Sequence, residues 1–209
     1  MPTTNRDWKT WCAYASAVMA ILQVALFLVS WLITAASPET TVRSLLSNEG
    51  IRWFFGSVVG NVASPPLVWI IFGAMALGAL QRSGMIQTLL RPRPRTYRQE
   101  FALRIVLIEL LLFLVVVAII AFVPHAALLS VTGQLFPSSF SSSLVPIIAF
   151  CVAVMAITFG FLTATMRSVA EAFQALCYGL SQSAPLVVLY VIAVELFFSL
   201  TYVFPLLCP

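Results

Sequence analysis

Five long apolar runs, joined by short polar segments, leave this chain few ways to fold. Each run has about the 20 residues that an α-helix needs to cross a bilayer, and helices bond their own backbone groups there. Charged residues are 9% of the 209 residues, far below the roughly 25% of soluble domains. The sequence therefore predicts an all-α, polytopic membrane protein, one membrane domain over residues 1–209, with spans near 13–36, 67–90, 101–124, 144–166 and 186–206.

Two further segments are apolar in part but do not fit a bilayer span. Residues 40–60 hold a short aromatic run, 53–59, that is too short to cross a membrane. Residues 167–182 carry Val169, Phe173, Leu176 and Leu180 at helical spacing, which is typical of an amphipathic helix in the interface. Both segments are predicted to be short interfacial helices.

The basic residues indicate the orientation of the chain in the membrane. Arg91, Arg93, Arg95 and Arg98 follow the second span, and the prolines between them prevent a regular helix. Cytoplasmic loops carry an excess of arginine and lysine. The arginine cluster therefore predicts a cytoplasmic N-terminus and, with five spans, a C-terminus on the opposite side.

Two groups of residues resemble the p-aminobenzoyl-glutamate transporter (AbgT) family. The first is spread over residues 47–86 and is similar to the family's S-x-E-G-(I/L)-R-W run, a following Asn and Pro-Leu, and a helix ending in S-G-(L/M)-I. Its residues are Ser47, Glu49, Gly50, Ile51, Arg52, Trp53, Asn61, Pro66, Leu67, Ser83, Gly84, Met85 and Ile86. The second group resembles a loop of the family, the start of the family's next helix and the G-x-x-T-G-T run that ends this helix. Its residues are 133–140, 144–148, Gly160, Thr163, Thr165, Arg167 and Ser168.

The resemblance implies a multi-pass protein of a bacterial inner membrane, with a periplasmic C-terminus. The family binds substrate and coupling ion at re-entrant hairpins, and here a short arginine-proline loop stands between residues 86 and 101 in place of the first hairpin. Nothing corresponding to the second hairpin follows the fifth span. We therefore expect the scaffold part of an AbgT transporter, with a role in transport as a scaffold-only subunit or oligomer. The alternative is a non-transporting structural or assembly subunit of a larger membrane complex.

Two carboxyl groups within predicted spans are the candidate intramembrane polar residues. Glu195 lies near the middle of the fifth span, and Glu109 lies about two turns into the third. A functional interpretation makes either one a proton site or a polar bond between subunits, because ionisable groups in a bilayer are expensive. The structural interpretation is that both are neutral or hydrogen-bonded to a neighbouring helix.

Small residues at four-residue spacing are the candidate helix-packing positions. They are Ala156, Gly160 and Ala164 in the fourth span, and Gly56 and Gly60 before the second. Such patterns let helix backbones approach closely. A dimer seam, as the family resemblance implies, and a contact within the chain are both open at this point; a hetero-complex with another membrane protein is the other arrangement considered.

Several classes of function are disfavoured by the residues that the sequence contains. The basic residues cluster beside apolar runs, which indicates lipid headgroups as their partners and no nucleic acid. Cys12, Cys151, Cys177 and Cys208 lack the spacing of a metal site, and no cofactor motif is present. No nucleophile elbow, Walker loop or HExxH pattern occurs, so the protein is not expected to be an enzyme.

Overall fold

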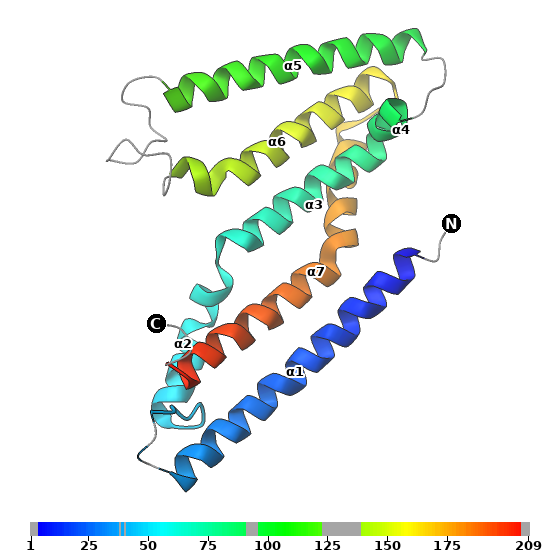
Figure 1. Ribbon diagram of the computed structural model, residues 1–209. Helices are drawn as coiled ribbons and strands as arrows, with labels where there is room; N and C mark the ends of the chain where they lie inside the picture. The colour runs from blue at the N-terminus through cyan, green and yellow to red at the C-terminus, as the bar shows by residue number, and fades with distance from the viewer. Residues whose placement is uncertain (1–3, 38, 40, 91–95, 123–138, 206–209) are drawn as a thin grey trace. The chain divides into compact units, whose positions relative to one another are not determined.

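The computed structural model of the chain describes residues 4–37, 39, 41–90, 96–122 and 139–205 (Figure 1). These residues form helices and turns, with no strand among them. The helices are α1 (Thr4–Ala36), α2 (Asn48–Val62), α3 (Pro65–Ser83), α4 (Met85–Leu90), α5 (Tyr97–Phe122), α6 (Ser139–Leu162) and α7 (Val169–Val203). The predicted fold class, all-α and polytopic, is confirmed.

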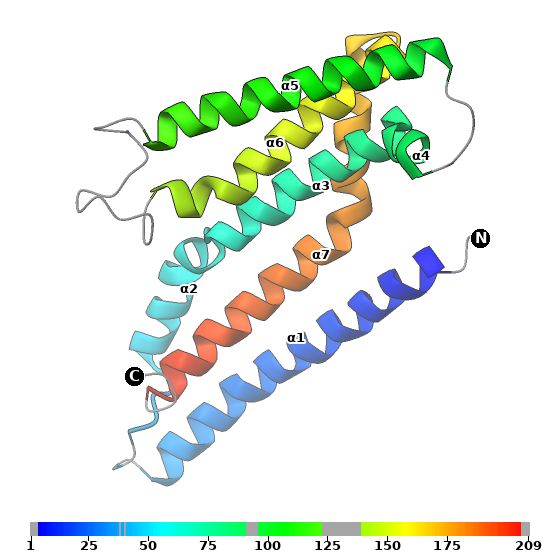
Figure 2. The same cartoon turned by 45° about the horizontal axis from the view of Figure 1, so that its top comes forward.

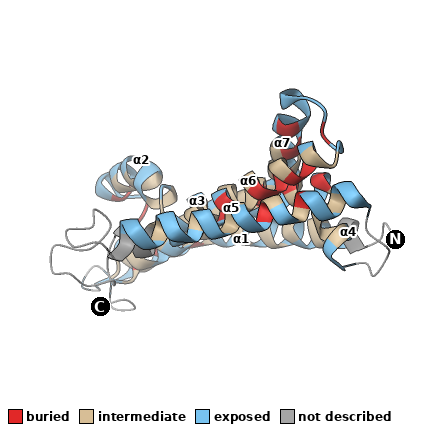
Figure 3. Ribbon diagram, turned by 90° about the horizontal axis from the view of Figure 1, so that it is seen from above, coloured by how far each residue is buried: buried red, intermediate tan, exposed pale blue. Residues whose placement is uncertain are grey.

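Within the described residues, five helices are long and apolar enough to cross a membrane. These candidate spans are Asp7–Ala36, Pro65–Ser83, Tyr97–Ile120, Ser143–Leu162 and Val169–Val203. Many of their large apolar side chains are exposed, and α1 and α5 show mainly exposed and intermediate residues in Figure 3. Continuous apolar surface of this extent is stable against lipid and not against water. The exposed residues therefore belong to a bilayer environment.

The second predicted span, 67–90, is divided into two helices in the structure. Helix α3 ends at Ser83, and Gly84 has a φ of 75°, in the left-handed region that ends many helices. The Ser83 hydroxyl donates to the Leu80 carbonyl at 3.1 Å and accepts from the Met85 N–H at 3.3 Å. These local bonds end α3 about two turns earlier than hydropathy alone predicts, and the short helix α4 begins after them.

Residues 167–182 do not form a separate interfacial helix, in contrast to the sequence-based prediction. They are the first part of α7, which continues through Pro185 to Val203. Helices in membranes tolerate proline, because neighbouring groups satisfy the freed carbonyl. The buried face of this part consists of the small residues Ala172, Ala175 and Gly179, whereas Val169 and Phe173 are exposed. The apolar periodicity therefore marked the outer side of a longer helix.

The chain packs as two compact units, which we describe separately. Unit 1 comprises residues 1–67 and 184–209, and unit 2 comprises residues 68–183. In unit 1, α1 runs beside the C-terminal half of α7 in both Figure 1 and Figure 2. Its core contains Leu26, Leu45 and Val203, and the ring of Trp53 stacks on Tyr202 with 4.3 Å between centroids. Unit 1 thus joins the first and last helices of the chain.

Unit 2 contains the packed pair α5 and α6, which lie side by side in Figures 1 and 2. Their core consists of Ala102, Val106, Cys151, Met155 and Phe159. In the same unit, α3 meets the first part of α7 at two glycines, Gly78 and Gly179. A Cβ on either glycine would meet backbone atoms of the other helix. This crossing therefore needs residues without a side chain.

Candidate functional site

Six polar side chains form three pairs in unit 1, and we call this set the polar seam. The pairs join Gln23 to Ser199, Asn61 to Glu195, and Ser64 to Tyr190. One member of each pair is on α7, and the others come from α1, α2 and the link that precedes α3. The Gln23 amide nitrogen donates to the Ser199 hydroxyl at 2.8 Å, and the Ser64 and Tyr190 hydroxyls are hydrogen-bonded. The polar seam thus connects α7 to α1, to α2 and to the link that precedes α3.

Glu195 lies in the polar seam, but its carboxyl group makes no hydrogen bond among the described residues. Its carboxyl interacts with the Asn61 amide. However, both carboxyl oxygens of Glu195 and the Asn61 amide nitrogen are buried, and none of these atoms has a hydrogen-bond partner among the described residues. The amide and the carboxyl are therefore neighbours without a hydrogen bond of ordinary geometry. An ionised carboxylate in mid-span costs at least about 2.5 kcal/mol on insertion scales. The group is therefore poised to be neutralised by something other than a protein side chain.

Glu109 has a different environment, in unit 2. Its Oε1 accepts a hydrogen bond from the Thr158 hydroxyl of α6 at 3.3 Å, while Oε2 is buried without a partner among the described residues. The side chain therefore joins α5 to α6, as the structural interpretation of this residue expects. Glu109 belongs to unit 2 and Glu195 to unit 1.

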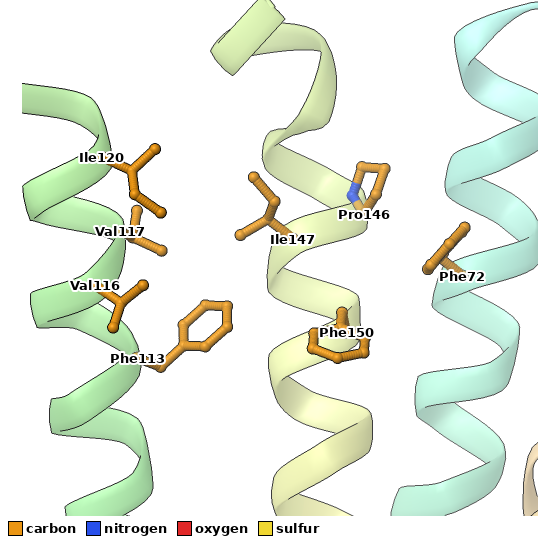
Figure 4. Close-up of a pocket in the computed structure, with 8 residues that line it drawn as sticks. All are labelled: Phe72, Phe113, Val116, Val117, Ile120, Pro146, Ile147 and Phe150. Atoms are coloured by element: carbon orange, nitrogen blue, oxygen red, sulfur yellow. The ribbon is translucent and has the colours of Figure 1, made fainter. Parts of the chain in front are cut away.

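An apolar cavity of about 350 Å³ lies between α3, α5 and α6 in unit 2 (Figure 4). Its lining residues come from these three helices and are all apolar: Phe72, Phe113, Val116, Val117, Ile120, Pro146, Ile147 and Phe150. Binding sites for polar solutes carry a few placed polar groups that orient the ligand. This cavity has none among its lining residues, so its chemistry suits a hydrocarbon chain.

The predicted small-residue stripe of the fourth span is interrupted in the structure. Ala156 is buried, and a Cβ on Gly160 would lie 2.8 Å from the sulfur of Met166 of the same chain. Ala164 does not continue the helical face, because α6 ends at Leu162 and Ala164 has a φ of 58°. The Met166 N–H instead bonds back to the Gly160 carbonyl at 3.0 Å. The Gly160 surface is therefore covered by its own chain.

The two glycines of α2 have open space around them. A Cβ on Gly56 or Gly60 would meet no atom within 4 Å. Phe55 and Val59, beside them on the same side of α2, are 75% and 76% exposed. Gly56 and Gly60 are therefore open to another helix, and close packing at these residues stays a prediction.

Sequence reasoning assigned no role in a site or in packing to several residues that the structure brings together. Ala74 and Gly78 on α3, and Ala175 and Gly179 on α7, are small residues at four-residue spacing, the same signal that singled out Gly56. Gln23 is the single amide side chain in the first predicted span, which is also a recognisable signal. Pairing Asn61 with Glu195 depends on contacts that no local pattern encodes.

The residues that resemble the AbgT family have structural roles around the turns. Ser47 is the N-cap of α2 and accepts from the Gly50 N–H at 3.0 Å. A Cβ at Gly50 would collide with the backbone of Ser44 and Leu45, which explains the glycine at this position. The part of the second group at 133–138 lies outside the described residues.

These features define a polytopic α-helical membrane protein with packed, polar-bonded helices inside its spans. Its structure is similar to that of the YdaH transporter of Alcanivorax borkumensis, with a TM-score of 0.69 and 14% sequence identity. The similarity covers 90% of this chain and 70% of the YdaH chain. YdaH is an AbgT-family transporter, and the shared fold supports the resemblance that the sequence indicated. The chain matches no protein-family model and no curated protein.

Proposed function

We propose that this chain is an AbgT-like protein of a bacterial inner membrane and that it acts in transport. The observation that carries the proposal is the shared fold with a transporter over 90% of the chain. A non-enzymatic role agrees with that neighbour.

Within transport, we assign the chain a scaffold role. Helix α4 ends at Leu90 and α5 begins at Tyr97, so residues 91–96 are the whole connection between them. A re-entrant hairpin needs two helical segments and their turn, which this connection is too short to supply. The scaffold would therefore work as a homo-oligomer or with another membrane protein that provides the moving part.

The exposed side of α2 supports a homo-oligomer as the first arrangement to test. Gly56 and Gly60 are open on that side, and Phe55 and Val59 flank them. In lipid, helices associate by close packing at such small residues. A second copy that meets this surface would build a dimer through α2.

Solute uptake into membrane vesicles tests the role in transport. Vesicles from host cells with and without the chain would be given one solute mixture that contains p-aminobenzoyl-glutamate, and internal solutes would be measured by mass spectrometry. We expect a difference in at least one solute. Uptake by the purified chain alone in liposomes would mean that its homo-oligomer transports, whereas uptake in the host vesicles alone would mean that another membrane protein provides the moving part. Identical solute profiles in the two vesicle populations would contradict the role in transport.

The alternative function, a structural or assembly subunit, gives a different result in the same preparation. Its supporting observation is the missing room for a hairpin between α4 and α5. In that case the solute profiles of the two vesicle populations are identical, while native mass spectrometry shows a membrane complex that dissociates when the chain is absent.

A further inference from the structure

The polar seam of unit 1 contains more unpaired acceptors than donors. Four of its buried polar atoms lack a hydrogen-bond partner among the described residues, and three of them are oxygens: Oε1 and Oε2 of Glu195 and Oε1 of Gln23. The fourth is the Asn61 amide nitrogen. The two N–H donors of one amide group cannot fill the lone pairs of a carboxylate and a carbonyl together, because each of these oxygens has two lone pairs. The site is therefore electron-rich.

No cationic side chain acts on Glu195 among the residues that the structure describes. Among the described residues, the single group that acts on the Glu195 carboxyl is the neutral amide of Asn61 on α2. Tyr190, on α7 itself, is the other titratable member of the polar seam, and its hydroxyl is bonded to Ser64. The α1 member, Gln23, does not titrate. The charge balance of the site thus depends on a species from outside the chain.

Gln23 is bonded to a residue one helical turn from Glu195. Its amide nitrogen is bonded to the Ser199 hydroxyl at 2.8 Å, and Ser199 is one helical turn beyond Glu195 on α7. Residues four apart on a helix share a face, with about 5 to 6 Å between their Cβ atoms. The unpaired carbonyl oxygen of Gln23 and the carboxyl of Glu195 therefore belong to one small region.

We propose that Glu195, with Gln23 and Asn61, forms an intramembrane binding site for one monovalent cation, a proton or a sodium ion. A proton turns one carboxyl oxygen into a donor and removes the charge. A sodium ion is held by the carboxyl oxygens and the Gln23 carbonyl, which replace its water ligands as carbonyls do in ion filters. Asn61 Nδ2 then donates to the remaining carboxyl lone pair. The inference stands on unit 1 alone and holds whether or not the chain moves a solute.

Carbodiimide labelling of the wild-type protein tests the sodium form. The apolar reagent dicyclohexylcarbodiimide modifies protonated carboxyl groups, and peptide mass spectrometry measures Glu195 and Glu109 in the same digest. At one pH, sodium chloride should lower the labelling of Glu195 severalfold relative to choline chloride, while Glu109 stays unchanged. Protection of both residues alike would reflect the reagent and argue against a sodium site.

Infrared difference spectra between acid and alkaline buffers test the proton form. We expect a protonated-carboxyl band that disappears as pH rises, is lost in Glu195→Gln and is retained in the matched control Glu109→Gln. If this band is present and sodium does not protect Glu195 from labelling, the site binds a proton. If sodium protects Glu195 from labelling, the site binds sodium. If the band is the same in Glu195→Gln as in wild type and sodium does not protect Glu195, the proposal is overturned. The labelling arm needs no variant, so it remains decisive if Glu195→Gln does not fold.

Discussion

The side-chain hydroxyl of Thr165 donates a hydrogen bond to the backbone carbonyl of Ser83, with 3.1 Å between the oxygens. Ser83 ends α3, and Thr165 lies in the turn that follows α6. The two residues are 82 positions apart and belong to the two separate groups that resemble the AbgT family. The two groups therefore meet in one joint of unit 2, where each ends a helix.

Replacing Thr165 tests the strength of this joint. Thr165→Val removes the hydroxyl whose single proton is shared between the Ser83 and Gly160 carbonyl oxygens, each 3.1 Å away. We expect a loss of stability of about 1 kcal/mol, since hydrogen bonds between helices in bilayers contribute modestly. Thr88→Val is the matched control, because Thr88 bonds only to Gly84 one turn earlier. Equal unfolding midpoints of the two variants in a denaturing detergent titration would argue that the joint adds nothing.

The glycine crossing of α3 and α7 should tolerate no side chain. A Cβ at Gly179 would collide with the Ala74 carbonyl, so Gly179→Ala should destabilise unit 2 by about 1 to 3 kcal/mol. Gly73→Ala is the control, because its Cβ meets no atom within 4 Å. Alanine is favoured over glycine in a helix by roughly 0.5 to 1 kcal/mol, so the control should be neutral or stabilising. Thermal melts of both variants measure the difference, and an unchanged Gly179→Ala would mean that the helices are farther apart.

Substituting leucine for each of the half-buried residues Glu195 and Glu109 separates a binding role from a structural one. Glu195 makes no hydrogen bond among the described residues, so Glu195→Leu should keep or raise the melting temperature. Glu109→Leu removes the bond from Thr158 and leaves that hydroxyl unpaired, so it should cost about 1 kcal/mol. A larger loss for Glu195→Leu than for Glu109→Leu would show that Glu195 holds the fold or the assembly together.

Leucine substitutions on α2 test the proposed dimer. Gly56→Leu and Gly60→Leu fill an open surface, so they should lower the oligomer mass in native mass spectrometry without lowering the helix content of the monomer. Gly160→Leu tests packing within the chain, because the new side chain would collide with Met166 of the same chain. We expect it to reduce stability, while the oligomer mass of the folded fraction is unchanged. A wild-type mass for both α2 variants would exclude this surface as the seam.

The orientation in the membrane is a prediction from the arginine cluster near Arg95. Cytoplasmic loops carry the excess of basic residues, so alkaline phosphatase fused near Arg95 should be inactive. A fusion after Pro209 should be active, because five spans separate the two ends of the chain. Activities in the reverse order would place the N-terminus on the outer side.

The helical class and the membrane setting could be predicted from the sequence because both depend on local composition. A run of about 20 apolar residues has to bond its own backbone in lipid, whatever its neighbours are. Local chemistry also marks helix ends: Ser47 caps α2, Pro65 begins α3 and Gly84 follows its end with a positive φ. Hydropathy alone did not predict the turn at Gly84, because the residues on both sides of it are apolar enough for one span.

The partners of each side chain were decided by tertiary structure, because contacts between helices depend on how distant segments pack. Periodicity placed Val169 and Phe173 on the apolar face of a short interfacial helix, but the segment is part of the longer helix α7, where Ala175 and Gly179 are the buried residues. The sequence by itself determined the helices, the bilayer and the presence of a carboxyl in the last span. Packing in unit 1 placed Asn61 beside that carboxyl and Gln23 against Ser199, one helical turn away, and left the carboxyl oxygens without a hydrogen bond among the described residues.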